Sequence, residues 1–163
     1  MAYMNDAPAA TTPVPVSDSV VRFIYLFNIF FLALTGFGQM PIYKRYYMSD
    51  IPGFGWLANF MTTRYIHYIA AVLLLALVAY IVLEYLVLKR KYRKITATGY
   101  LRIVLLTGIV LTGSLFVIKN FPFYLFSPNV IIFLNLCHIG CVMAFLLVSL
   151  YCALFKKKWT ISF

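Results

Sequence analysis

Residues 65–88 read YIHYIAAVLLLALVAYIVLEYLVL, a run of 24 residues with a single acid, Glu84, and no Lys or Arg. About 20 apolar residues in a helix are enough to cross the hydrocarbon of a bilayer. Three further apolar windows, at 23–40, 103–118 and 129–155, bring the apolar share to just over half of the 163 residues. The sequence therefore predicts an all-α integral membrane protein, a bundle of four transmembrane helices.

The composition excludes an ordinary soluble domain. Hydrophobic residues make up 64% of the chain and charged residues only 11%, whereas about a quarter of the residues of a soluble domain are charged. The sequence outside the four windows is too short for a large catalytic domain. Any demanding chemistry would therefore come from a cofactor or a partner.

The net charge of +10 lies mainly outside the apolar windows. Five Lys and Arg residues occupy 89–94 and three Lys residues occupy 156–158, against four in the other two loops. Cytoplasmic loops are enriched in Lys and Arg, so we expect both termini and the loop after the second helix to be cytoplasmic. Charge placed at helix ends in this way indicates a membrane topology and no nucleic-acid partner.

The expected organisation follows from these windows. We expect a polar N-terminal tail over residues 1–19, a transmembrane domain over 20–155 and a basic C-terminal tail over 156–163. The helices of that domain are expected at about 20–40, 62–88, 101–118 and 129–155. Residues 1–19 contain no Lys or Arg, so they lack the basic start of a secretory signal peptide, and we expect the first helix to remain uncleaved.

His67 and His138 are the only histidines in the chain, and each lies in an apolar window. Ionisable side chains are costly inside a bilayer and usually mark a site. Neutral imidazole is the commonest metal ligand, and helix bundles hold cofactors by side chains on facing helices. Two histidines on different helices at similar depth fit a haem iron bound from both faces. The same spacing also fits two histidines that only form hydrogen bonds with neighbouring groups.

Arg64 and Gly36 are candidate neighbours of that cofactor. Arg64 precedes His67 by three residues, so the two share one face of a helix. A guanidinium binds a carboxylate through two parallel hydrogen bonds, which suits a haem propionate, although an arginine that extends to interfacial water fits as well. Gly36 lets a flat macrocycle or a neighbouring helix approach closely.

Three motifs follow one another along the apolar windows: Thr35-Gly36 in the first, Arg64-Tyr65-Ile66-His67 in the second and His138 in the fourth. In this order the chain, over residues 22–155, resembles the four-helix cytochrome b subunits of membrane formate dehydrogenases, nickel–iron hydrogenases and thiosulfate reductases. The resemblance implies that His67 and His138 are the axial ligands of a haem near the outer membrane surface.

The chain departs from this family at the second haem that its members commonly hold near the inner surface. The ligand positions of that haem on the first and fourth helices are Tyr25 and Cys152 here, so we expect one haem b and not two. The inner quinone-binding stretch of the family corresponds to residues 97–100, where only Gly99 is retained.

The resemblance implies a membrane anchor and electron-transfer subunit in a bacterial or archaeal cytoplasmic membrane. It would pass electrons between an iron–sulfur subunit on the outer face and a quinone, menaquinone or ubiquinone, within a complex whose catalytic subunit is of the formate dehydrogenase or hydrogenase type. Two alternatives stay open. One is a haem-free anchor that assembles such a complex, and the other is a small quinone-reactive enzyme or transporter that acts through Glu84 and Tyr25.

Overall fold

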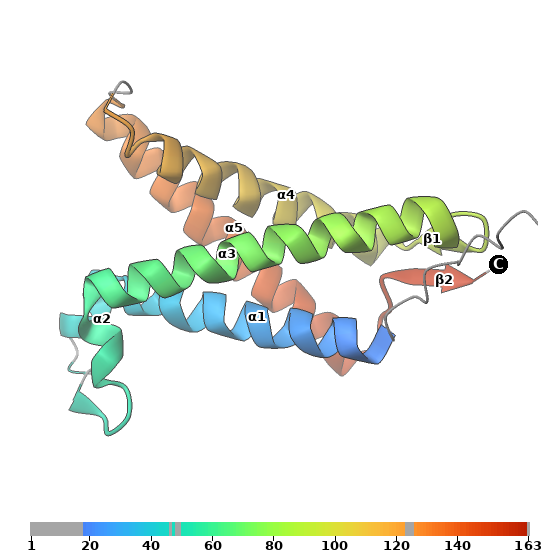
Figure 1. Ribbon diagram of the computed structural model, residues 1–163, viewed down its shortest axis with the longest axis horizontal. Helices are drawn as coiled ribbons and strands as arrows, with labels where there is room; N and C mark the ends of the chain where they lie inside the picture. The colour runs from blue at the N-terminus through green and yellow to red at the C-terminus, as the bar shows by residue number, and fades with distance from the viewer. Residues whose placement is uncertain (1–17, 46, 48–49, 123–125, 163) are drawn as a thin grey trace, which may run out of the picture. The chain divides into compact units, whose positions relative to one another are not determined.

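The computed structural model describes residues 18–45, 47, 50–122 and 126–162 (Figure 1). The protein is 79% helical, and within these residues four helices are long and apolar enough to cross a membrane. They are α1 (Asp18–Gly38), α3 (Phe60–Glu84), α4 (Ala97–Ile118) and α5 (Pro128–Leu154). The predicted all-α architecture with four membrane-length helices is confirmed. Most of the expected N-terminal tail, residues 1–17, lies outside the described residues.

The ends of the long helices follow from local capping. Asn59 accepts hydrogen bonds from the backbone N–H groups of Met61 and Thr62 at 3.1 and 3.2 Å and so begins α3. Thr96 accepts the Gly99 N–H at 2.9 Å and begins α4, four residues before the expected start, because the side chain of Thr96 satisfies a first-turn donor that would otherwise lack a partner. The observed helix ends all lie within four residues of the expected ones.

Shorter elements join the long helices. They are α2 (Pro41–Arg45), the 3-10 helix η2 (Gly55–Ala58), the π-helical turn η3 (Tyr85–Lys89) and the strands β1 (Arg93–Ile95) and β2 (Thr160–Ser162). The chain divides into two compact units, an N-terminal unit over Met1–Tyr85 and a C-terminal unit over Leu86–Phe163. In the N-terminal unit α1 packs against α3, and in the C-terminal unit α4 packs against α5.

In the N-terminal unit, η2 packs against the ends of α1 and α3. Leu57 and Thr63 are fully buried there. The Thr63 hydroxyl donates to the carbonyls of Leu57 and Asn59 at 3.0 and 2.8 Å. Gly38 permits this packing, since a Cβ atom in its place would lie 3.2 Å from both side chains. One buried hydroxyl therefore ties η2 to the first turn of α3.

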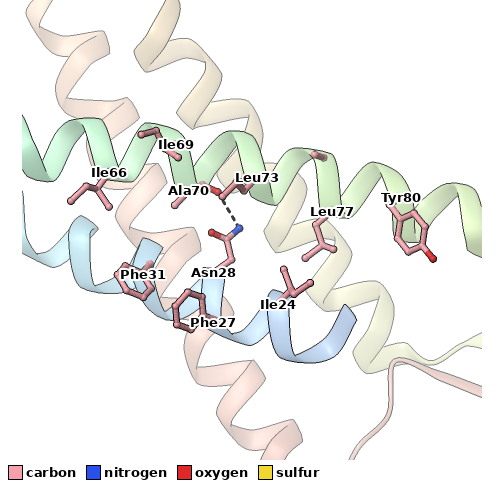
Figure 2. Close-up of a pocket in the computed structure, with 11 residues that line it drawn as sticks. Ile24, Phe27, Asn28, Phe31, Ile66, Ile69, Ala70, Leu73, Leu77 and Tyr80 are labelled. Atoms are coloured by element: carbon pink, nitrogen blue, oxygen red, sulfur yellow. Dashed lines mark hydrogen bonds between the residues drawn. The ribbon is translucent and has the colours of Figure 1, made fainter. Parts of the chain in front are cut away.

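A groove of about 500 Å³ runs between α1 and α3 (Figure 2). Its lining is almost wholly apolar, and Asn28 is the buried polar residue within it. The Asn28 side-chain amide donates to the Ala70 carbonyl at 3.1 Å. This hydrogen bond joins the two helices at the middle of their contact.

In the C-terminal unit, β1 and β2 form an antiparallel pair with Lys94 opposite Ile161. The sequence did not predict these strands, and the segment expected as a basic C-terminal tail contains β2. The chain reverses after α5 because Lys156 adopts a left-handed backbone conformation with φ of 52° and the Lys157 N–H donates to the Cys152 carbonyl at 2.8 Å. This turn directs the last residues back toward β1.

The Thr63 hydroxyl gives a test of this fold. Replacing Thr63 with Val keeps the side-chain volume and removes the donor to the buried Leu57 carbonyl and the part-buried Asn59 carbonyl, so we expect the free energy of unfolding to fall by about 1 kcal/mol. Thr62→Val, at an exposed neighbouring position, is the matched control and should change it by less than about 0.5 kcal/mol. Both are measured by denaturant titration in micelles. Equal effects of the two substitutions would contradict the assigned role.

Candidate functional site

His67 lies near the start of α3 and is half-buried. Its Nδ1 atom is 2.9 Å from the Thr35 hydroxyl of α1. The next residue of α1, Gly36, lies against the same ring, because a Cβ atom at Gly36 would be 3.5 Å from His67 Cε1. The last turns of α1 therefore present a hydroxyl and an open backbone surface to this imidazole.

His138 of α5 is also half-buried, and its threonine and glycine neighbours in the C-terminal unit correspond to those of His67, while its ring also forms a hydrogen bond with the Ile109 backbone. Its Nδ1 atom lies 2.8 Å from the Thr112 hydroxyl of α4. A Cβ atom at Gly113 would be 3.6 Å from His138 Cε1. The ring of Phe116 meets the imidazole edge to face, with centroids 5.7 Å apart.

The two units repeat one arrangement of residues. Leu34-Thr35-Gly36 in α1 serves His67, and Leu111-Thr112-Gly113 in α4 serves His138. In each unit the Thr-Gly pair lies near the end of the first long helix and the histidine nearer the start of the second. Thr35 was identified from sequence only through the family resemblance and Thr112 was not identified, because Leu-Thr-Gly occurs three times in the chain, at 34–36, 106–108 and 111–113, and the sequence does not show which copies face a histidine.

Each threonine hydroxyl has a single proton, and its position fixes the protonation of the histidine. Thr35 Oγ1 donates to the Phe31 carbonyl at 2.6 Å, and Thr112 Oγ1 donates to the Gly108 carbonyl at 2.7 Å. With its proton used in this way, the hydroxyl accepts a hydrogen bond from the imidazole, and we assign the imidazole proton to Nδ1. In the neutral ring this leaves the lone pair on Nε2, which is the atom that would bind a metal.

Arg64 lies one turn before His67 on α3, as expected, and is half-buried. Its Nε donates to the Tyr68 hydroxyl at 3.1 Å, and the guanidinium carbon lies 5.4 Å from the centre of the Tyr68 ring. The structure therefore places Arg64 against an aromatic side chain of the same helix. Its role as a partner of a propionate stays a prediction.

The residues at the expected inner-haem positions are Tyr25 on α1 and Cys152 on α5. Cys152 is 2% exposed and packs as a small apolar side chain. Among the described residues no group of three or more His, Cys, Asp or Glu side chains is placed to hold a metal ion. A haem iron takes at most two axial ligands from the protein and so needs no such group of three.

The fold defines a multi-pass membrane protein, with four helices in the described residues that are long and apolar enough to span a bilayer. Comparisons with protein-family models, with curated proteins and with solved structures find no match to this chain. The functional argument therefore depends on the two histidines and on the residues that surround them.

The assigned tautomers can be tested without any cofactor. In ¹⁵N-histidine-labelled protein purified without metal, we expect both imidazoles to give NMR shifts of the Nδ1–H form, because each Nδ1–H donates to a hydroxyl. Thr35→Val should move the His67 signals toward the Nε2–H form and leave His138 unchanged. Thr112→Val should shift the His138 signals, by less because the Ile109 backbone hydrogen bond remains, and leave His67 unchanged.

The serine variants of the same two threonines keep the hydroxyl and should keep the wild-type spectrum. Thr107→Val, at an exposed position of α4, is a control for a changed threonine that contacts neither imidazole. An unchanged His67 spectrum in Thr35→Val, or an unchanged His138 spectrum in Thr112→Val, would contradict the assignment.

Proposed function

We propose that this chain is the cytochrome b subunit of a membrane redox complex, with one haem b bound through His67 and His138. The observation that supports the proposal is the repeated arrangement of threonine, glycine and histidine in two pairs of membrane helices. A single histidine inside a membrane helix is often satisfied by the nearest backbone. Two histidines with the same partners and the same tautomer suit a symmetric pair of axial ligands.

The depth of the two histidines in their helices agrees with this role. His67 follows the first residue of α3 by seven residues, and His138 follows the first residue of α5 by ten. At 1.5 Å per residue the difference is about 5 Å. If the four helices cross the bilayer in succession, α3 and α5 enter it from the same side, and both imidazoles then lie in the same half of the membrane.

Different residues of the chain would have different roles in binding the haem. The two imidazoles would supply Nε2 ligands, while Thr35 and Thr112 fix the rotation and the tautomer of each ring. Gly36 and Gly113 have no side chains and leave room beside the two rings. When bound, a haem with two imidazole ligands supplies reversible one-electron transfer.

Arg64 is the residue we assign to a haem propionate. It belongs to the same helix as His67, and a guanidinium has five N–H donors, of which the Nε donor contacts Tyr68. The remaining donors suit a carboxylate in the geometry that arginine favours. The Tyr68 contact would hold the guanidinium in place beside the ligand.

Within the complex, the chain would anchor its partners and conduct electrons without carrying out chemistry on a substrate. We propose an iron–sulfur subunit on the outer face, a quinone such as menaquinone or ubiquinone in the membrane, and a catalytic subunit of the formate dehydrogenase or hydrogenase type. Both termini would be cytoplasmic, in a bacterial or archaeal membrane. One haem is proposed because Tyr25 and Cys152 occupy the positions of the second ligand pair.

A haem-free anchor is the second candidate. It is favoured by one observation, namely that the Thr35 and Thr112 hydroxyls already provide each histidine with a hydrogen-bond partner. Such a protein would keep the histidines as part of its helix packing. The two candidates differ in whether the purified chain contains haem.

Haem content decides between these candidates. We expect the purified full-length chain to give a pyridine haemochrome of one haem per chain, and His67→Ala and His138→Ala each to abolish its reduced-minus-oxidised spectrum, because each removes an axial ligand. Tyr25→Phe and Cys152→Ala are the matched controls and should keep one haem per chain. A folded wild-type chain without haem would overturn the proposal in favour of the haem-free anchor.

The midpoint potential of the bound haem reports on the threonines. A hydrogen bond from Nδ1–H makes the imidazole a stronger electron donor, which favours ferric iron. We therefore expect Thr35→Val and Thr112→Val to raise the potential in a redox titration, and the corresponding serine variants to leave it near the wild-type value. A potential unchanged in both valine variants would show that the hydroxyls do not act on the ligands.

A further inference from the structure

The positive charge of this protein is unevenly distributed along the chain. Residues 86–163 contain ten of the 14 Lys and Arg residues and no Asp or Glu. The C-terminal unit therefore holds no acidic side chain that could balance its own cations.

The structure gathers most of these cations at one end of the α4–α5 pair. We name this surface the basic platform, and all of its charged side chains are exposed. Its members are Arg90, Lys91, Arg93, Lys94, Lys156, Lys157 and Lys158.

Hydrogen bonds from the backbone and side chain of Thr96 hold the two basic segments together, although they are about 60 residues apart in sequence. The Thr96 N–H donates to the Trp159 carbonyl at 3.0 Å, and the Thr96 hydroxyl donates to the Lys158 carbonyl at 2.9 Å. Strand β2 then pairs with β1 (Figure 1). The basic platform is thus a folded structure and not two separate tails.

Trp159 fixes the platform to the start of α4. Its ring lies 4.1 Å from the guanidinium carbon of Arg102, which is 5% exposed and whose Nε donates to the Thr98 carbonyl at 3.2 Å. Gly99 makes the approach possible, because a Cβ atom there would lie 2.5 Å from the Trp159 carbonyl oxygen. A side chain at this position would displace the C-terminal segment.

The basic platform lies where membrane helices end. Strand β1 stops two residues before α4 begins, and Lys156 follows the last residue of α5 by two. Exposed aromatic side chains flank the charges, namely Tyr92 and the pair Tyr151 and Phe155, whose ring centres are 4.6 Å apart with the ring planes tilted by 40°. Aromatic side chains at helix ends are typical of the level of the lipid headgroups.

We infer that the basic platform binds the phosphates of anionic phospholipids. Clusters of four to eight Lys and Arg residues beside a membrane helix attract anionic headgroups, and the exposed guanidinium of Arg90 suits bidentate binding of phosphate. An acidic protein would also offer negative charge, but charges this close to helix ends and aromatic residues already meet the headgroup layer. The inference does not depend on the haem.

The test uses the full-length chain in nanodiscs made of equal parts phosphatidylcholine and phosphatidylglycerol. After gentle transfer to detergent, the phosphatidylglycerol retained by the protein is measured by native mass spectrometry. We expect the wild-type chain to retain it several-fold above phosphatidylcholine. Lys156→Gln, Lys157→Gln and Lys158→Gln combined should remove most of this preference.

A substitution that leaves the charge unchanged tests whether the lipid preference needs the folded basic platform or only its positive charge. Gly99→Ala keeps every cation but displaces Trp159, so we expect the preference to fall as it does in the triple variant. Gly140→Ala, where an added Cβ meets nothing within 4 Å, is the matched control and should behave as the wild type. Trp159→Leu serves as a second charge-neutral variant if Gly99→Ala does not fold.

Three results would contradict the inference. The first is a wild-type chain that retains both lipids equally. The second is a poly-glutamate peptide that binds in phosphatidylcholine nanodiscs while phosphatidylglycerol is not retained, which would make the partner an acidic protein. A preference that is unchanged in both Gly99→Ala and Trp159→Leu would reject the folded platform.

Discussion

Hydrocarbon offers no hydrogen-bond partners, so a chain that crosses it must satisfy its polar groups internally. The four long helices do this for the backbone, and the buried polar side chains follow the same rule. Asn28, Thr35, Thr63 and Arg102 each donate to a backbone carbonyl, either of their own helix or of a neighbouring segment. Two of these four bonds join separate elements, because Asn28 links α1 to α3 and Thr63 links α3 to η2. The helix contacts of the N-terminal unit are thus made specific by a few polar groups within a largely apolar surface.

The same rule explains the histidine sites. A threonine whose proton is used by a carbonyl one turn earlier in its helix can only accept a hydrogen bond from its other neighbour. His67 and His138 are those neighbours, and both rings are therefore held with the lone pair on Nε2. The same hydroxyl–imidazole hydrogen bond occurs twice in one chain, and it leaves each Nε2 with the lone pair that the proposed iron ligand needs. This repetition is the physical basis of the proposed cytochrome b function, and it gives each half of the protein an equivalent part in it.

Gly99 has a packing role in this chain that is separate from the family resemblance. In sequence it is only the retained residue of an altered quinone-binding stretch. In the structure it lies beneath the Trp159 carbonyl, where a side chain would collide. The close approach it permits brings the two basic segments into one surface. The positive charge at this end thus has a defined shape, set by backbone pairing, in addition to its effect on topology.

The number of long helices, their ends to within a few residues and the two histidines as candidate site residues all follow from the sequence. The length of an apolar run and the identity of a capping residue depend only on residues that are close in sequence, so both can be predicted from the sequence alone. The partners of His67 and His138, the β1–β2 pair and the Trp159–Arg102 contact were not predictable in this way. They join residues between 26 and more than 60 positions apart, and they depend on how each helix is rotated about its axis when it packs against its neighbour. Nearly uniform apolar helices carry little periodic signal for that rotation, so only the packed structure decides which threonine faces which imidazole.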